Sequence, residues 1–193
     1  MSITKIGVIG AGLMGNGITH TALVSGFEVV LVDAFAAALP KALATMTKNM
    51  DRQISKGTLT EEAKTAALGR LTTSTDYGAL AGAELIIEAA PENEELKEKI
   101  YKSLLPLIGA NTILASNTSS LSITRLGAIT GRADKFIGMH FFNPVPMMKL
   151  VEIIRGIATS DETYATIHAL AEKLGKTVAT AEDSPGFIVN RVL

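Results

Sequence analysis

The sequence contains no cysteine, and it carries no marked excess of charge of either sign. Without cysteine, disulfide bonds and thiolate metal sites are excluded. The formal net charge is −1, and neither basic nor acidic residues form a block longer than a few positions. This balance argues against nucleic acid or a membrane surface as the main partner.

Targeting signals and long apolar runs are also absent. The opening residues MSITKIGVIG show neither a charged leader before an apolar stretch nor a transit segment rich in Arg and Ser. No apolar run reaches the roughly 18 residues that span a bilayer. We therefore expect a soluble, cytoplasmic protein. Its 193 residues suit one α/β domain with a few residues left over. The composition, 47% hydrophobic and 19% charged, allows a large buried core.

The sequence does contain an alternation of strand patterns and helix patterns. Short β-branched apolar runs, such as residues 3–9 and 27–32, are typical of buried parallel strands. Strands separated by helices predict βαβ units and a mostly parallel sheet flanked by helices. The predicted strands are 3–9, 27–32, 71–74, 84–88, 112–115, 136–141, 150–154 and 177–181. The predicted helices run from the glycine-rich turn to about 25, then 36–56, a short one from 60, 94–105 and 161–174.

The first strand is followed by a turn that fits G-x-G-x-x-G, residues 10–15. Gly10 permits a tight turn, Gly12 lets the backbone approach a pyrophosphate, and Gly15 allows close packing of helix on strand. The helix that follows presents free N–H groups to the phosphates. The expected cofactor contacts in this turn are Gly10, Gly12, Leu13, Met14 and Gly15. The alternative is a similar turn in a fold that binds no nucleotide.

Asp33 ends the second predicted strand, 18 residues after Gly15. A carboxylate there can accept hydrogen bonds from a ribose 2′-hydroxyl and would repel a 2′-phosphate. Residues 34–36 offer no Arg or Lys that could hold such a phosphate. The sequence therefore favours NAD over NADP.

Among three histidines, His140 is the candidate for proton transfer. His20 and His168 lie in predicted helices and are interpreted as structural. His140 follows a predicted strand and precedes a loop rich in proline, and histidine titrates near neutral pH. Glu152 lies in an apolar strand, where burial is costly unless the carboxylate is paired, so we expect it to pair with His140. The alternatives are a histidine that caps the loop and a glutamate exposed on an edge strand.

Two polar segments follow predicted strands at the same edge of the sheet. Residues 116–120, Ser-Asn-Thr-Ser-Ser, are able to surround a nicotinamide or a substrate hydroxyl, and equally to cap a helix. In residues 91–93, Pro-Glu-Asn, the carboxylate is suited to bond ribose hydroxyls or to begin the next helix.

The last ten residues have the pattern of a helix start. Ser184 suits an N-cap and Pro185 the first helical position, and apolar residues follow up to Leu193. The sequence ends there without a polar last turn or a glycine, and so short a helix is marginal alone. We expect the natural protein to continue, so that this chain is a truncated form or a fragment.

Five segments together resemble one family: GVIGAGLMG, EAAPEN, SNTSSLSIT, GMHFFNPVPMMKLVEII and DSPGFIVNRVL. They are similar to the NAD-dependent L-3-hydroxyacyl-CoA dehydrogenases and, within them, to the bacterial 3-hydroxybutyryl-CoA dehydrogenases. The resemblance covers essentially the whole chain. It implies a Rossmann-type NAD-binding domain, residues 1–183, and the start of a helical C-terminal domain, residues 184–193, the rest of which is missing here. It also implies a homodimer for the full-length protein.

The resemblance assigns roles to individual residues. His140 is the catalytic acid/base with Glu152 as its partner, and Ser119 and Asn190 bind the reacting oxygens of the substrate. The residues expected around NAD are Asp33, Glu92, Lys97, Asn117 and Asn143. Those expected at CoA are Lys56, Ser119 and Asn49, where some family members have a serine. Arg52 is added to them by its charge alone.

The implied reaction is NAD-dependent oxidation of (S)-3-hydroxyacyl-CoA to 3-oxoacyl-CoA, and its reverse. One alternative is a related dehydrogenase of small hydroxy acids, such as an L-gulonate dehydrogenase. Another is an NAD-binding domain with little or no activity in this form. CoA is favoured by the basic positions of the 36–56 helix.

Overall fold

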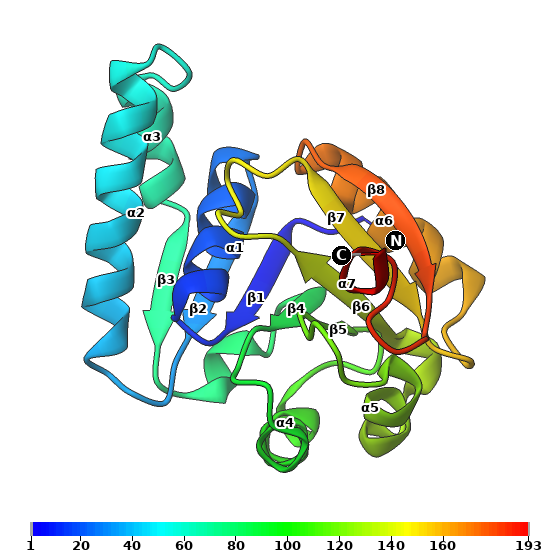
Figure 1. Ribbon diagram of the computed structural model, residues 1–193. Helices are drawn as coiled ribbons and strands as arrows, with labels where there is room; N and C mark the ends of the chain where they lie inside the picture. Colours follow the sequence, from blue (N-terminus) through cyan, green and yellow to red (C-terminus); the bar gives the residue numbers. More distant parts are fainter. Residues whose placement is uncertain (1, 193) are drawn as a thin grey trace.

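An eight-stranded sheet forms the centre of the computed structural model, which describes residues 2–192 (Figure 1). The strand order is β3-β2-β1-β4-β5-β6-β7-β8. All neighbouring strands are parallel except β6 and β7, which are antiparallel, so the predicted mostly parallel sheet is confirmed. The strands are β1 (Lys5–Ile9), β2 (Glu28–Val32), β3 (Leu71–Ser74), β4 (Leu85–Glu88), β5 (Ile113–Ser116), β6 (Phe136–Phe141), β7 (Leu150–Arg155) and β8 (Thr177–Glu182).

The direction of strand addition reverses at the centre of the sheet. The chain builds outward from β1 to β3 and then returns to place β4 on the other side of β1. In open α/β sheets a crevice forms at such a point, beyond the carboxyl ends of the strands. The glycine-rich turn after β1 and the loop after β4 therefore border one crevice.

Helices cover both faces of the sheet (Figure 1). One core joins the sheet to α1, α2 and α6, and a second core joins the opposite face to α4 and α5. Successive strand residues alternate between these cores, because side chains of a strand point to opposite faces. The helices are α1 (Leu13–Val24), α2 (Ala38–Ser55), α3 (Glu61–Leu68), α4 (Glu94–Leu104), α5 (Ile123–Thr130), α6 (Asp161–Lys173) and α7 (Val189–Val192), with short 3-10 turns at Tyr77–Leu80, Leu105–Leu107 and Ala133–Lys135.

Side-chain caps explain where four helices begin. The side chains of Thr60, Asn93, Ser122 and Ser160 accept the backbone N–H three residues later, which satisfies a free donor of the first turn. The starts of three of these helices, α3, α4 and α6, were predicted within one residue. The helix α5, which follows the Ser-Asn-Thr-Ser-Ser segment, was not predicted.

The prediction of a helix from Ser184 is wrong. Residues 184–188 form a turn, and α7 begins only at Val189. Gly186 and Phe187 have φ values of 78° and 49°, in the left-handed region, and two such residues interrupt a right-handed helix. The predicted continuation at Leu193 lies outside the described residues. His140 lies within β6, as the predicted strand 136–141 has it, and does not follow the strand.

A buried polar cluster supports the loop after β4. The Glu88 carboxylate, 1% exposed, accepts hydrogen bonds from Lys97 Nζ at 2.6 Å, Tyr101 Oη at 2.9 Å, Ser116 Oγ at 2.7 Å and the Ala90 amide at 2.6 Å. Burial and the neighbouring Glu88 charge raise the pKa of Tyr101 well above its ordinary value, so the phenol remains a donor. The cluster ties β4, β5 and α4 together beside the crevice.

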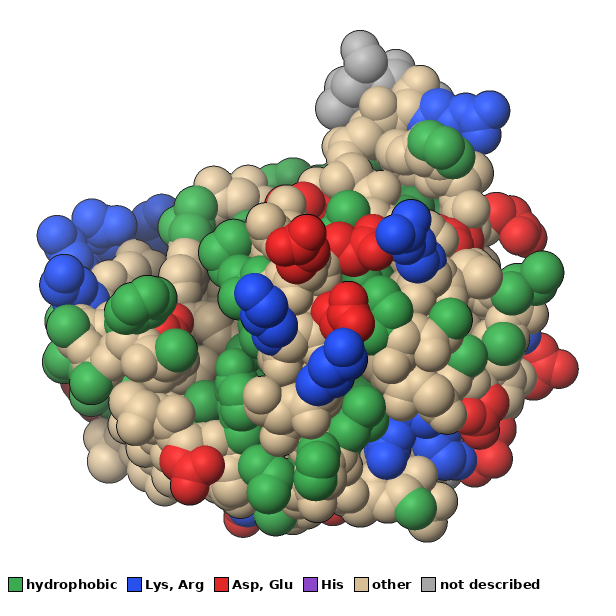
Figure 2. All heavy atoms as spheres, turned by 90° about the horizontal axis from the view of Figure 1, so that it is seen from below, with side chains coloured by type: hydrophobic (Ala, Val, Ile, Leu, Met, Phe, Trp, Pro, Cys, Tyr) green, Lys and Arg blue, Asp and Glu red, His purple; other side chains and the backbone are tan. Residues whose placement is uncertain are grey.

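The outer surface over α4 and α5 mixes both signs of charge, as Figure 2 shows. Two ion pairs lie on it, Arg125–Glu94 at 2.7 Å and Lys102–Glu98 at 2.6 Å. Within residues 2–192, every helix is too short or too polar to cross a bilayer.

The glycine turn yields a prediction for stability. A Cβ at Gly15 would lie 1.7 Å from the carbonyl oxygen of Gly10, whereas a Cβ at Gly12 would meet no atom within 4 Å. We expect Gly15→Ala to lower the free energy of unfolding by about 1–3 kcal/mol, because the backbone must move to relieve the clash. Gly12→Ala is the matched control and leaves stability close to native. Urea denaturation of both variants tests this, and equal stabilities would contradict it.

The Glu88 cluster yields a second prediction. Lys97→Met keeps the length of the side chain but leaves a buried carboxylate without its cation, at a cost of about 3–5 kcal/mol. Lys99→Met, at an exposed position of the same helix, is expected to change stability by less than about 0.5 kcal/mol. The midpoints of denaturant unfolding compare the two. A Lys97→Met protein of native stability would show that burial of the Glu88 carboxylate does not require this ion pair.

Candidate active site

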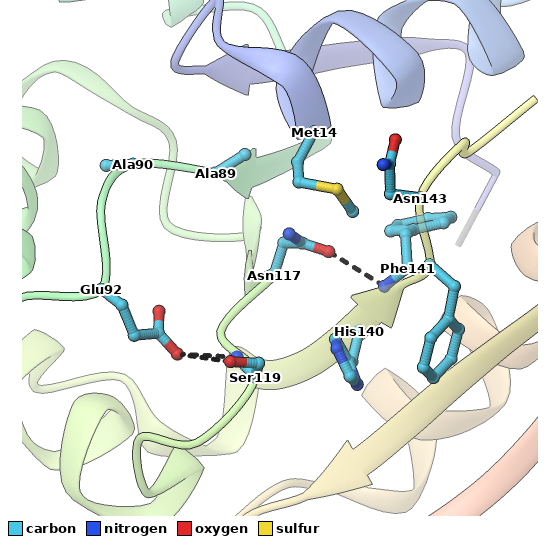
Figure 3. A pocket seen from close by; sticks show the side chains of 10 residues that line it. Met14, Ala89, Ala90, Glu92, Asn117, Ser119, His140, Phe141 and Asn143 are labelled. Carbon is cyan, nitrogen blue, oxygen red and sulfur yellow. Dashed lines mark hydrogen bonds between the residues drawn. The ribbon is translucent and has the colours of Figure 1, made fainter. Parts of the chain in front are cut away.

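Two adjoining cavities form the crevice at the carboxyl ends of the strands. The first, of about 500 Å³, is bordered by the glycine turn, Asp33 and Tyr77, and is called the turn cavity here. The second, of about 360 Å³, is bordered by His140 and is called the His140 cavity (Figure 3). Met14, Ala89 and Ala90 line both, so a long ligand has room to extend from one into the other.

The glycine turn leaves open space where a pyrophosphate would lie. Gly10 has a φ of 100°, and a Cβ there would lie 2.7 Å from the carbonyl oxygen of Ala89. Gly12 lines the turn cavity and caps α1, whose first amides have no partner in the helix itself. The space above Gly12 and these amides together fit a dinucleotide pyrophosphate.

Asp33 lies at the far side of the turn cavity. One carboxylate oxygen accepts the Ala11 amide at 2.7 Å, and the other accepts the Phe35 amide at 2.8 Å. These bonds fix the carboxylate against the glycine turn while it remains half-buried at the cavity wall. This position fits a carboxylate that accepts hydrogen bonds from ribose hydroxyls.

His140 and Glu152 form a hydrogen-bonded pair across two strands. They are direct partners in the antiparallel register of β6 and β7, and His140 Nδ1 lies 2.7 Å from Glu152 Oε2. His140 is 6% exposed and Glu152 is fully buried, so the alternative of an edge-strand glutamate exposed to solvent is wrong. Because the carboxylate accepts the Nδ1 proton, Nε2 is left as the proton acceptor of the neutral ring.

Aromatic rings and backbone amides complete the surroundings of this pair. The Phe142 and Phe187 rings lie 4.5 Å and 6.0 Å from the His140 ring, between centroids. The second Glu152 oxygen, Oε1, accepts the amides of Ile188 at 3.0 Å and Val189 at 2.9 Å. Each oxygen of the buried carboxylate is thus bonded, as burial requires.

Glu92 and Ser119 line the His140 cavity, and Asn190 contacts Ser119. Glu92 accepts the Ser119 amide at 2.7 Å (Figure 3), and Asn190 donates its side-chain N–H to the Ser119 carbonyl at 3.1 Å. Burial raises the pKa of the Glu92 carboxyl, but hydrogen bonds from residues 118–120 outweigh it, and its pKa lies below the ordinary value. A charged Glu92 therefore links the loops after β4 and β5.

Asn117 and Asn143 also line the His140 cavity, whereas Lys97 does not. Asn117 Oδ1 accepts the Phe141 amide at 2.9 Å, which ties the end of β5 to β6 (Figure 3). Lys97 is 1% exposed, and its ammonium contacts Glu88 and, at 3.2 Å, the Ala90 carbonyl. Direct contact of Lys97 with a cofactor stays a prediction. In the structure, the Lys97 side chain supports the loop after β4.

A third cavity, of about 490 Å³, is called the α2 cavity and gathers three of the four residues expected at CoA, whereas the fourth, Ser119, lines the His140 cavity. Asn49, Arg52 and Lys56 of α2 and its C-cap line one side of the α2 cavity. Pro144 and Met147 of the loop after β6 line the other. Asn143 borders the His140 cavity and Pro144 the α2 cavity, so the same loop forms part of the wall of both.

Several residues of the site were not found by sequence reasoning. Phe142 and Phe187 surround His140, Tyr77 lines the turn cavity, and Glu88 supports the loop that separates the cavities. The glycine before Phe187 was the available signal for a turn. Among residues 2–192, no three histidine, aspartate or glutamate side chains are grouped so as to hold a metal ion.

Comparison with known proteins agrees with this geometry. Residues 5–184 match the family described as 3-hydroxyacyl-CoA dehydrogenase, NAD binding domain. The chain is 53% identical, over 99% of its length, to a 3-hydroxybutyryl-CoA dehydrogenase of Bradyrhizobium diazoefficiens, and covers 65% of it. It is 46% identical over its full length to a probable 3-hydroxybutyryl-CoA dehydrogenase of Bacillus subtilis, and covers 67% of that protein.

Solved structures give the same result. A crystal structure of (S)-3-hydroxybutyryl-CoA dehydrogenase from Ralstonia eutropha superposes with a TM-score of 0.97 at 53% identity. The match covers 99% of this chain and 68% of that one, so the chain spans about two thirds of the length of these relatives. The predicted resemblance is confirmed, and the chain belongs to the NAD-binding domain family of the 3-hydroxyacyl-CoA dehydrogenases.

Proposed function

We propose that this chain provides the cofactor site and the acid/base pair of an NAD-dependent 3-hydroxyacyl-CoA dehydrogenase. The substrate pair is (S)-3-hydroxyacyl-CoA, most simply 3-hydroxybutyryl-CoA, and the corresponding 3-oxoacyl-CoA. The observation that carries the proposal is the pairing of His140 Nδ1 with Glu152 Oε2 at 2.7 Å, at the wall of the cavity that adjoins the glycine turn.

NAD is held through backbone and carboxylate groups in this proposal. The open turn at Gly12 and the first amides of α1 receive the pyrophosphate, and Asp33 accepts the adenosine ribose hydroxyls. Glu92, Asn117 and Asn143 lie around the other half of the cofactor. When bound, NAD accepts the hydride that leaves C3 of the substrate.

The proton of the substrate hydroxyl passes to His140 Nε2 as the C3–H bond breaks and the carbonyl forms. The imidazolium that results is stabilised by Glu152, whose negative charge is already in place before the reaction. Ser119 lines the same cavity, Asn190 is hydrogen-bonded to its carbonyl, and in this proposal the two residues hold the reacting oxygens. The reverse reaction returns the proton from Nε2 to the oxygen.

The α2 cavity supports CoA as the carrier of the acyl group. Arg52 and Lys56 offer positive charge in a cavity whose wall shares the loop of residues 143–144 with the His140 cavity. A dehydrogenase of small hydroxy acids would have no use for the α2 cavity. Retention of the chain on immobilised CoA separates these two alternatives.

Three expectations stay predictions: the homodimer, the cytoplasmic location, and the division of the chain after residue 183. Because the chain spans about two thirds of its relatives, its own turnover is the first quantity to measure. NADH oxidation with acetoacetyl-CoA measures it. Binding of NADH without turnover would favour the alternative of an NAD-binding domain with little activity.

Substitution of the histidine tests the proton transfer. His140→Gln keeps a polar side chain of similar size but removes the base, and we expect turnover to fall by about 10²–10⁴-fold. Affinity for NADH, measured by fluorescence titration, should stay unchanged. His168→Gln, in α6, is the matched control and should retain native turnover. Native turnover in His140→Gln would refute the assignment.

Substitution at the end of β2 tests the choice of cofactor. The double variant Asp33→Ser, Ala34→Arg removes a carboxylate and adds a cation for a 2′-phosphate. A hydrogen bond to a charged group contributes about 1.5–3 kcal/mol, so the affinity for NADPH relative to NADH should rise by at least about tenfold. Ala34→Arg alone should gain less, because Asp33 still repels the phosphate. An unchanged affinity ratio in the double variant would place the adenosine ribose elsewhere.

A further inference from the structure

We propose that the turn at residues 185–189, called the 185–189 turn here, is a positioning element of the His140–Glu152 pair. The Phe187 ring excludes water from the imidazole, and the amides of Ile188 and Val189 hold the carboxylate in place. The inference rests on the proposed function only in assigning proton transfer to His140.

The backbone of this turn adopts a conformation that its sequence does not favour. Gly186 has a φ of 78° and Phe187 a φ of 49°. Phe187 is the only non-glycine residue with positive φ among residues 2–192, and a bulky side chain in this region costs free energy. Such strain persists only where surrounding contacts compensate for it, and it is concentrated at functional sites.

The Phe187 side chain is buried in the second core, and there it also approaches His140. Phe187 is 3% exposed although the residues on either side of it are more open, and its ring lies 6.0 Å from the imidazole. Phe142 approaches the same imidazole at 4.5 Å. Two aromatic rings therefore take positions around His140 that water would otherwise fill. A hydrogen bond in such a poorly hydrated place is stronger than one in water.

The compensating contact of the backbone is with Glu152. The two left-handed residues reverse the chain, so that the next two amides, of Ile188 and Val189, point at the same oxygen, Oε1. His140 Nδ1 occupies the other oxygen, Oε2. With both oxygens bonded, the carboxylate is unable to rotate away from the imidazole. One short turn thus controls both the hydration and the orientation of the pair.

This arrangement makes a prediction about one proton. The proton between His140 Nδ1 and Glu152 Oε2 should be shielded from water and exchange slowly, which gives it a distinct signal at low field in the proton NMR spectrum of the 193-residue chain. His140→Gln removes the signal and so assigns it. Phe187→Ala should raise its rate of exchange with water by at least about tenfold, because water then reaches the ring.

Two matched variants separate this role from general loss of packing. Phe187→Leu restores an apolar side chain and should recover slow exchange. Ile188→Ala changes a neighbouring side chain that is 40% exposed and leaves both amides in place, so it should behave as native. A sharp, slowly exchanging signal in Phe187→Ala would overturn the proposal, as would equally fast exchange in Ile188→Ala.

A measurement on the unchanged chain covers the case in which Phe187→Ala does not fold. If the 185–189 turn shields the pair, the Nδ1 proton of His140 and the amides of Ile188 and Val189 are exposed by one opening motion. The exchange rates of these three protons should then rise by the same factor as denaturant is added. Rates that rise by different factors would overturn the proposal. None of these readouts involves turnover, so their failure is distinguishable from failure of the proposed reaction.

Discussion

The buried carboxylate of Glu152 is the constraint on which the site depends. A charge with no exposed surface is tolerated only when each oxygen has a partner, and this one binds an imidazole on one side and two amides on the other. The antiparallel pairing of β6 and β7 makes the first contact possible, since it sets residues 140 and 152 directly opposite each other. The need to satisfy Glu152 therefore orients the base and also draws the end of the chain onto the site.

A second buried charge organises the other side of the crevice. Glu88 gathers Lys97, Tyr101 and Ser116 behind the loop after β4, and the same loop carries Glu92 toward residues 118–120. Lys97 serves this arrangement from inside, with 1% of its side chain exposed. The cofactor crevice thus has fixed walls before any ligand arrives, which lowers the cost of ordering them on binding.

Local patterns predicted most of the sheet, and distant contacts decided the rest. The β-branched runs predicted every strand, and the glycine turn with Asp33 predicted the crevice. The cost of burying Glu152 predicted its pairing with His140, now seen at 2.7 Å. The pattern at Ser184–Pro185 favours a helix, but contacts with Glu152 and His140, far away in sequence, impose a turn instead. Burial of Lys97 was equally unpredictable locally, because its counter-charge lies on another element.

The loop between β6 and β7 explains how the His140 cavity and the α2 cavity, where we propose that CoA binds, are held in a fixed relative position. Its Val145 packs against α1, where a Cβ on Gly17 would lie 2.8 Å from it. The Lys176 ammonium, at the start of β8, donates to the carbonyls of Val145 and Met148, and burial lowers its pKa. One wall of the His140 cavity and one wall of the α2 cavity are thus the same loop, anchored from both sides. A shift of this loop would displace Asn143 and Pro144 together, so the relative position of the His140 cavity and the α2 cavity depends on how firmly residues 17 and 176 hold the loop.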